Sequence, residues 1–168
     1  DRVIVERVIN DGYPVSWHTV HKGTGVEYYG FAGLRQALQK GDMCHSHRRC
    51  VKHIPEEYFT ASIAQRMELL AGLLDTDGTL RAKEHRYSFS TTEPQMRDDF
   101  VTLVSTFGWR CSVVEYPPRV SSSGIKGNLT VYTIAFNPTC PIPCVVPRKQ
   151  PKEFSKPRRV AFCGFERI

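Results

Sequence analysis

The sequence predicts a mixed α/β fold of the α+β kind, in which helices pack on an antiparallel sheet. Two capping boxes, Ser62 with Gln65 and Thr92 with Gln95, each mark the start of a helix. Each predicted helix is followed by two segments that alternate polar and apolar residues, as strands with one buried face do. Residues 62–136 therefore read helix, strand, strand, helix, strand, strand. Neither a dinucleotide-binding glycine fingerprint nor a phosphate-binding P-loop occurs.

The first fifty residues carry weaker signals. Residues 3–9, VIVERVI, are predicted to form a strand, and NDG at 10–12 predicts a turn into a second strand over 13–20. Residues 29–41 predict a short helix that ends at a glycine, and 42–50 predict a polar loop.

The central elements are better defined. The first capping box begins a helix over 63–77, and Gly78 is its expected C-terminal stop. The segment 79–92 predicts a hairpin with one polar, cationic face. The second capping box begins a helix whose apolar residues share one side, and strands are predicted over 110–116 and 128–136.

The charge balance favours a polyanionic partner. The chain has 23 Lys and Arg against 17 Asp and Glu, a formal charge of +6 and a pI near 9.1. Such a surplus suits nucleic acid, although a merely soluble basic protein has the same balance. No apolar run reaches the length of a membrane helix and no signal peptide is recognised, so we expect an intracellular protein without membrane contact.

Six cysteines raise the question of a structural zinc site. Cys44, His47 and Cys50, or Cys140 and Cys144, are the candidate ligands, but their spacings match zinc knuckles poorly. We expect free thiols.

Two carboxylates at the end of the predicted helix over 63–77 are the main functional signal. A helix C-terminus carries partial negative charge, so Asp75 and Asp77 need compensation there. Asp75 can shape the turn, whereas Asp77 with the free carbonyls would form an oxygen-rich site suited to Mg²⁺. Two turn-forming aspartates without a metal remain the simpler alternative.

Two other motifs compete for these residues. An EF-hand fails, because its twelfth position falls on Arg86 rather than on glutamate. The string DTDGTL resembles the motif of haloacid-dehalogenase-type phosphatases, with Asp75 as the phosphorylated nucleophile and Asp77 as acid/base. That family needs a strand before the motif and a large parallel domain after it, which the predicted helix and hairpin contradict.

A third resemblance is closer. LAGLLDTDG, residues 70–78, resembles the signature of the LAGLIDADG homing endonucleases and differs only at 74 and 76. KHIP at 52–55 resembles the lysine-bearing block before the second motif of intein-encoded members, and 87–109 resembles the strand and helix after it. VVPRK at 145–149 and RRVAFCGFERI at 158–168 resemble the stretch that leads back into an intein splicing domain.

This resemblance implies an αββαββα lobe whose four-stranded antiparallel sheet binds double-stranded DNA. Residues 51–138 would be that lobe, 1–50 the remainder of a preceding lobe, and 139–168 a basic C-terminal extension toward a splicing domain. The implied function is a homing endonuclease, within an intein, that hydrolyses phosphodiester bonds of one long DNA site with Mg²⁺ or Mn²⁺.

The resemblance also assigns site residues. Asp77 would hold the metal together with Gly78, and Lys52 would support catalysis, with Lys149, or its neighbour Lys152, in that role for the other half-site. Small residues would let two motif helices approach, and Asp75 would be structural. The expected set is Ala71 and Gly72 for helix approach, and Arg81, Lys83, Arg86, Ser88, Ser90, Arg119 and Lys126 for DNA contact.

The chain departs from the family in having one motif where cleavage of both strands needs two. We expect the second lobe either upstream in the same precursor or from a symmetric homodimer. The alternatives are a degenerate module of the same fold that binds nucleic acid without cleaving it and, less favoured, the phosphatase.

Overall fold

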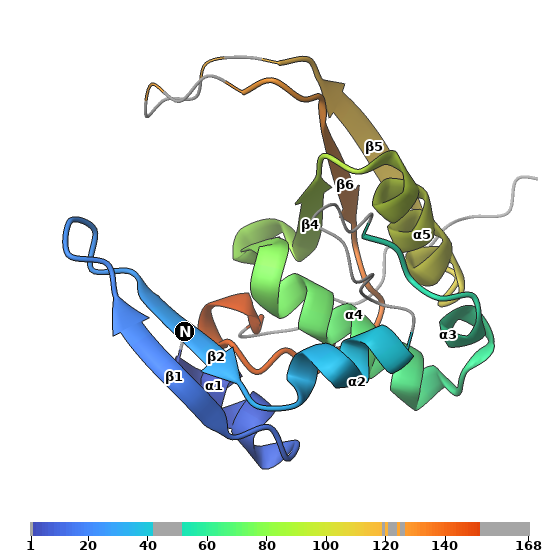
Figure 1. Cartoon of the computed structure of the whole chain (residues 1–168). Helices are drawn as coiled ribbons and strands as arrows, with labels where there is room; N and C mark the ends of the chain where they lie inside the picture. Colours follow the sequence, from blue (N-terminus) through green and yellow to red (C-terminus); the bar gives the residue numbers. More distant parts are fainter. Residues whose placement is uncertain (1, 42–51, 119, 121–123, 125–126, 152–168) are drawn as a thin grey trace, which may run out of the picture.

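A computed structural model of the chain describes residues 2–41, 52–118, 120, 124 and 127–151 (Figure 1). These residues form a two-stranded sheet, β1–β2, and a four-stranded sheet with strand order β3–β4–β6–β5. All strand pairs are antiparallel, and helices accompany both sheets. The predicted α+β fold is therefore confirmed. Across the described ranges, no helix is long and apolar enough to span a bilayer.

The N-terminal unit consists of α1 (Arg2–Asn10), β1 (Val15–Val20), β2 (Glu27–Phe31) and α2 (Leu34–Lys40). The strand predicted over 3–9 is wrong, because that segment is α1. Its β-branched residues favour a strand locally, but the segment lies against α4, where Arg7 reaches Glu68 at 3.4 Å. The NDG signal marks the end of this helix, with Gly12 at φ 95°. The strand over 13–20 is confirmed as β1. The helix predicted over 29–41 is confirmed only in part, as α2, because residues 29–31 belong to β2, a strand that was not predicted.

The central helix α4 (Ile63–Asp77) follows the short α3 (Glu57–Thr60) and begins as predicted. Ser62 Oγ accepts the Gln65 N–H at 3.3 Å, and Gln65 Oε1 accepts the Ser62 N–H at 3.1 Å. At its other end the helix passes directly into β3 (Gly78–Arg81). A Cβ at Gly78 would lie 2.6 Å from the Cα and O atoms of Leu74, so only glycine fits this junction.

The remaining elements complete the four-stranded sheet. A 3₁₀ turn, η1 (Ala82–Glu84), joins β3 to β4 (Arg86–Thr91), and α5 (Pro94–Ser105), β5 (Cys111–Tyr116) and β6 (Val131–Phe136) follow. The second capping box is wrong: α5 begins at Pro94 with no side-chain cap, and Gln95 donates to Asp99 instead. After β6 the described residues contain the single turn η2 (Pro147–Lys149) rather than the last helix of the expected order.

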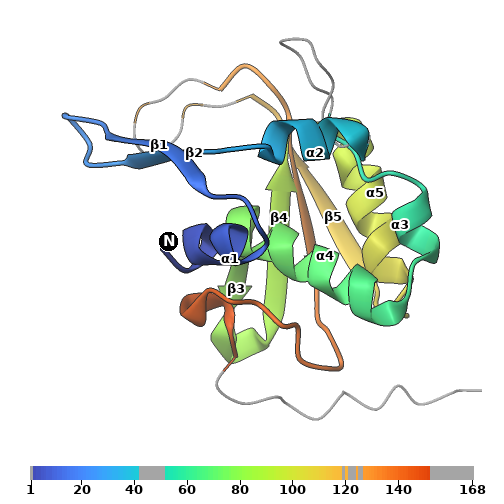
Figure 2. The same cartoon turned by 60° about the horizontal axis from the view of Figure 1, so that its bottom comes forward.

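The core lies between the sheet and the helices α4 and α5, which pack on one of its faces (Figure 2). Phe89 of β4 stacks on Phe100 of α5, with ring centroids 4.3 Å apart. Both side chains are buried, as are Ile134 and Phe136 of β6. The segment after β6 joins this core through buried Ile142, Cys144 and Val146, and it runs past the C-terminal end of α4.

Candidate nucleic-acid interface and metal site

Asp77 and Lys52 come together in one cavity of about 530 Å³. Lys52 precedes α3, and Asp77 is the last residue of α4. The chain reverses its direction at α3, so that Lys52 lies near the C-terminal end of α4. The other lining residues come from the segment before α3, from α4, from the end of β4 with the following turn into α5, and from β6. They are His53, Leu73, Phe89, Ser90, Thr91, Thr92, Glu93, Met96 and Val131. Sequence reasoning missed His53 and Glu93, although His53 belongs to the KHIP block.

Asp75 and Asp77 face opposite environments. Asp75 is 5% exposed, and its two carboxylate oxygens accept the N–H groups of Val145 at 2.8 Å and Val146 at 3.1 Å. Asp77 is exposed and lines the cavity. The geometry agrees with a structural Asp75 and leaves Asp77 available to a ligand.

Lys149 is not among the residues that line that cavity, and only 4% of its surface is exposed. Its Nζ donates to the carbonyls of Leu74 and Asp75, both at 2.6 Å, and of Thr76 at 3.3 Å. Burial lowers the pKa of this ammonium, as does Arg148, while Asp75 opposes the shift. Lys149 therefore occupies three of the carbonyls that were expected to be free at the helix end, and a cation site at Asp77 stays a prediction.

The described residues supply only part of a metal site. Asp77 offers one carboxylate, and no group of three or more His, Cys, Asp or Glu side chains gathers in the described ranges. Gly78 donates its N–H to the Leu74 carbonyl, and its role as a ligand stays a prediction. The donor set therefore fits half of a divalent-cation site whose remaining ligands would come from elsewhere.

The zinc alternative gains no support from the described cysteines. Cys111, Cys140 and Cys144 are free thiols, and burial raises the pKa of Cys144 to about 12. Cys44, His47, Cys50 and Cys163 lie outside the described residues.

The sheet presents a polar face on the side opposite the helices. Strand register pairs Thr79 with Ser88 and Arg81 with Arg86, so these side chains share one face with Ser90, while Tyr87 and Phe89 point into the core. The predicted cationic face of the hairpin is therefore present.

Strands β5 and β6 extend this face with residues that the sequence argument did not single out. Arg86 Nη2 donates to Ser112 Oγ at 2.6 Å, and Ser90 Oγ lies 3.0 Å from Thr133 Oγ1. The alternation within the two strands was the signal that could have identified Ser112 and Thr133.

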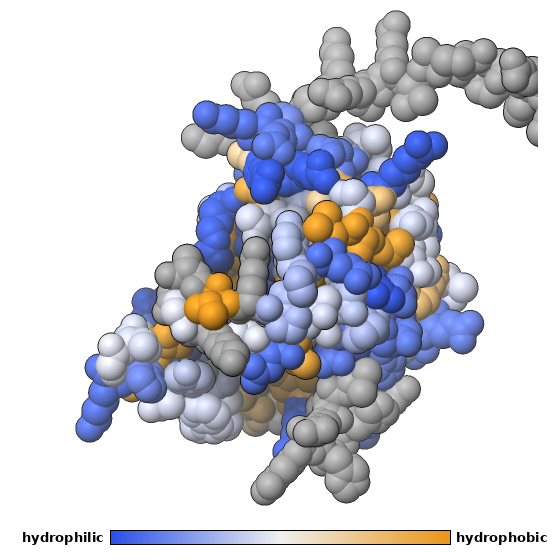
Figure 3. Space-filling view, turned by 90° about the horizontal axis from the view of Figure 1, so that it is seen from above, coloured by the Kyte–Doolittle hydropathy of each residue, from blue (hydrophilic) through white to orange (hydrophobic). Residues whose placement is uncertain are grey.

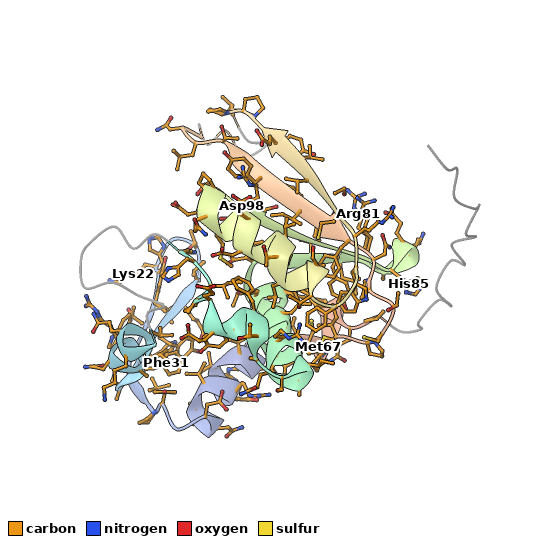
Figure 4. The ribbon with its side chains drawn as sticks, turned by 90° about the vertical axis from the view of Figure 1, so that its right-hand side faces the viewer. Lys22, Phe31, Met67, Arg81, His85 and Asp98 are labelled. Carbon is orange, nitrogen blue, oxygen red and sulfur yellow. The ribbon has the colours of Figure 1, made fainter. Side chains whose placement is uncertain are left out.

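Lys83 is placed differently from the expectation, and Arg81 makes an ion pair at the same turn. Lys83 lies in the η1 turn rather than on a strand, and Arg81 reaches Glu84 at 3.7 Å. Arg81 and His85 lie together at this turn, on the opposite side of the molecule from Lys22 and Phe31 (Figure 4). Arg119 and Lys126 fall outside the described residues. The surface seen from above is mostly hydrophilic, with hydrophobic residues in separate patches (Figure 3).

Comparison with known proteins agrees with this geometry. A family profile described as "LAGLIDADG-like domain" matches residues 64–132, which run from α4 into β6. A protein named replicative DNA helicase DnaB, from Mycobacterium intracellulare, is 45% identical over 84 residues, which is 49% of this chain. The matched segment spans only 14% of the length of that protein. The profile match and the sheet-and-helix arrangement lead to one conclusion: residues 64–132 of this chain form a LAGLIDADG domain of the homing-endonuclease type.

Proposed function

We propose that this chain is one half of a site-specific DNA endonuclease, carried within an intein, that hydrolyses phosphodiester bonds of a long double-stranded target. The observation that carries the proposal is the shared cavity of Asp77 and Lys52 at the end of the motif helix α4. The cavity includes Ser90 of the polar sheet face, so a duplex lying on that face would bring a phosphate to it.

The residues have distinct roles in this proposal. Asp77 would hold a divalent cation, Mg²⁺ or Mn²⁺, whose chemistry at this site would be the activation of water and the neutralisation of phosphate charge. Lys52 stabilises the negative charge that develops on the phosphate as water attacks. Arg86, Ser88 and Ser90 contact the duplex, with arginine providing charge and the hydroxyls providing hydrogen bonds.

A repeated substructure supports a second lobe. In the C-terminal half, α5 is followed by Gly108 at φ 76°, an aromatic residue and a six-residue strand beginning at Cys111. In the N-terminal half, α1 is followed by Gly12 at φ 95°, an aromatic residue and a six-residue strand beginning at Val15. Equivalent positions are 96 residues apart, and a pairing strand follows in both cases. We infer that α1, β1 and β2 are the second half of a preceding lobe, whose motif helix would supply the second carboxylate.

The small residues of the motif helix face α1 across a narrow space. A Cβ at Gly72 would meet no atom within 4 Å, and Ala71 and Gly72 line a cavity of about 280 Å³ between α4 and α1. Small residues at this position favour close approach of another helix, as the family resemblance implies.

The helicase match supports the intein context. A nuclease-type segment that aligns with 14% of a protein named helicase is what an inserted element would produce. We infer that this chain belongs to an insertion of that kind in a host protein.

The two alternatives fare differently. A non-cleaving DNA-binding module fits the finding that no group of three or more His, Cys, Asp or Glu side chains gathers in the described ranges, and it remains the second candidate. The phosphatase is not supported, because Asp75 is buried with both oxygens engaged and an antiparallel hairpin follows the motif.

The experiment is cleavage of a randomised DNA library in Mg²⁺ by the chain alone and by its precursor with the upstream segment. The proposal predicts cuts at one long site that Asp77→Asn abolishes while DNA affinity is retained. Binding without cleavage by both proteins would select the non-cleaving module. Cleavage by the chain alone as a dimer would select the homodimer over the upstream lobe.

A further inference from the structure

The side chain of Lys149 contacts the backbone at the C-terminal end of α4. A helix leaves its last four carbonyls without intrahelical partners, and in α4 these belong to Leu74, Asp75, Thr76 and Asp77. The Gly78 N–H donates to the Leu74 carbonyl. The ammonium of Lys149 donates to Leu74, Asp75 and Thr76, so its three hydrogens meet three of the four carbonyls.

The backbone of Lys149 is held as firmly as its side chain. Its N–H donates to the Val146 carbonyl at 2.9 Å, and its carbonyl accepts the Tyr87 hydroxyl at 2.8 Å. Tyr87 is 1% exposed and belongs to β4 of the main sheet. The ammonium is thus fixed relative to both the sheet and the helix.

A second contact runs in the reverse direction. The carboxylate of Asp75, on the last turn of α4, accepts the N–H groups of Val145 and Val146 just before η2. The carboxylate of Asp75 on α4 thus binds the segment 145–149, and the ammonium of Lys149 in that segment binds α4. Because both groups are buried, loss of either leaves polar atoms without partners.

We propose that Lys149 is a positioning residue that clamps the C-terminal turn of α4 and so sets the direction of Asp77, rather than a lysine that contacts DNA phosphate. Asp77 is the residue directly after the three clamped carbonyls, so a fixed last turn fixes its carboxylate in the cavity with Lys52. The statement about Asp77 rests on the proposed nuclease function, whereas the clamp does not.

The contrast with Lys52 supports this role. Lys52 is exposed and lines the cavity, where a phosphate could reach its ammonium. Lys149 is 4% exposed, and its three hydrogens are already engaged. A phosphate contact would require this ammonium to leave the helix end, which would expose the negative end of the helix dipole within the core.

The first test measures the clamp without any nuclease assay. The folded chain is treated with an amine-acylating reagent, and each lysine is followed by mass spectrometry. Lys149 should react at least tenfold more slowly than Lys52 and Lys83, and the difference should vanish in denaturant. In hydrogen exchange, Lys149→Met should speed exchange of the Val145, Val146 and Gly78 amides, whereas the distant charge-matched control Lys22→Met should not.

The second test separates positioning from phosphate contact and from a purely structural role. Lys149→Met keeps the length of the side chain, and it is assayed at a temperature at which the variant is fully folded. A positioning role predicts that kcat falls about 100-fold with KM unchanged. It also predicts an unchanged slope of log DNA affinity against log salt, because no phosphate contact is lost.

Three results would overturn the proposal. Acylation of Lys149 as fast as that of Lys83 would rule out the clamp. A salt slope smaller by about one would show a phosphate contact. An unchanged kcat in the folded variant would show that the clamp serves stability alone. If no assembly cleaves DNA, the proposed function fails, and acylation and hydrogen exchange still decide whether the clamp exists.

Discussion

Asp75 and Asp77 are predicted to respond oppositely to substitution, although only one residue separates them. Asp75→Ala removes the acceptor of two N–H groups, from Val145 and Val146, at a site that is 5% exposed. Leaving a buried polar group without a partner costs about 1–3 kcal/mol, so two such groups cost about 2–6 kcal/mol. Asp77→Ala removes an exposed side chain, and such changes stay within about 0.5 kcal/mol.

The measurement is equilibrium unfolding in urea. With an m-value of about 2 kcal/mol/M, Asp75→Ala should lower the midpoint by about 1–3 M, and Asp77→Ala by less than about 0.3 M. Asp77→Ala should nonetheless abolish any DNA cleavage, whereas its DNA affinity should persist. Equal midpoint shifts for the two variants, or a larger shift for Asp77→Ala, would refute the assignment of Asp75 to structure and Asp77 to the site.

Three further outcomes are expected. Gly78→Ala should lower the free energy of unfolding by about 1–3 kcal/mol in urea titrations, because its Cβ would lie 2.6 Å from Leu74 backbone atoms; an unchanged midpoint would contradict this. Thermal stability should fall as pH rises from about 9 to about 12. Burial raises the pKa of Cys111 to about 11 and of Cys144 to about 12, so the unfolded chain loses these two protons at a lower pH than the folded chain does. Melting curves recorded across this pH range test the prediction, and a flat profile would contradict it. Arg86→Ala should reduce the salt slope of DNA affinity by about one, and an unchanged slope would remove this residue from the interface.

The local signals predicted most of the LAGLIDADG lobe correctly. The capping box at Ser62 fixes where α4 begins, and alternation predicted β3 to β6, because both patterns depend on neighbours in sequence. Two other local signals failed. Residues 3–9 have strand-like composition but form α1 beside α4, and Gln95 bonds to Asp99 rather than closing a capping box.

The sequence alone determined the type of lobe, the bounds of the motif helix and the presence of two acids at its end. Only the tertiary structure decided what each acid does. Residues two apart on a helix point about 200° away from each other, so one of the pair faces the core when the other faces the cavity. The packing of residues 144–149 decides which of the two acids is buried. The same packing places Lys149, which was expected to support catalysis for the other half-site, at the buried end of α4.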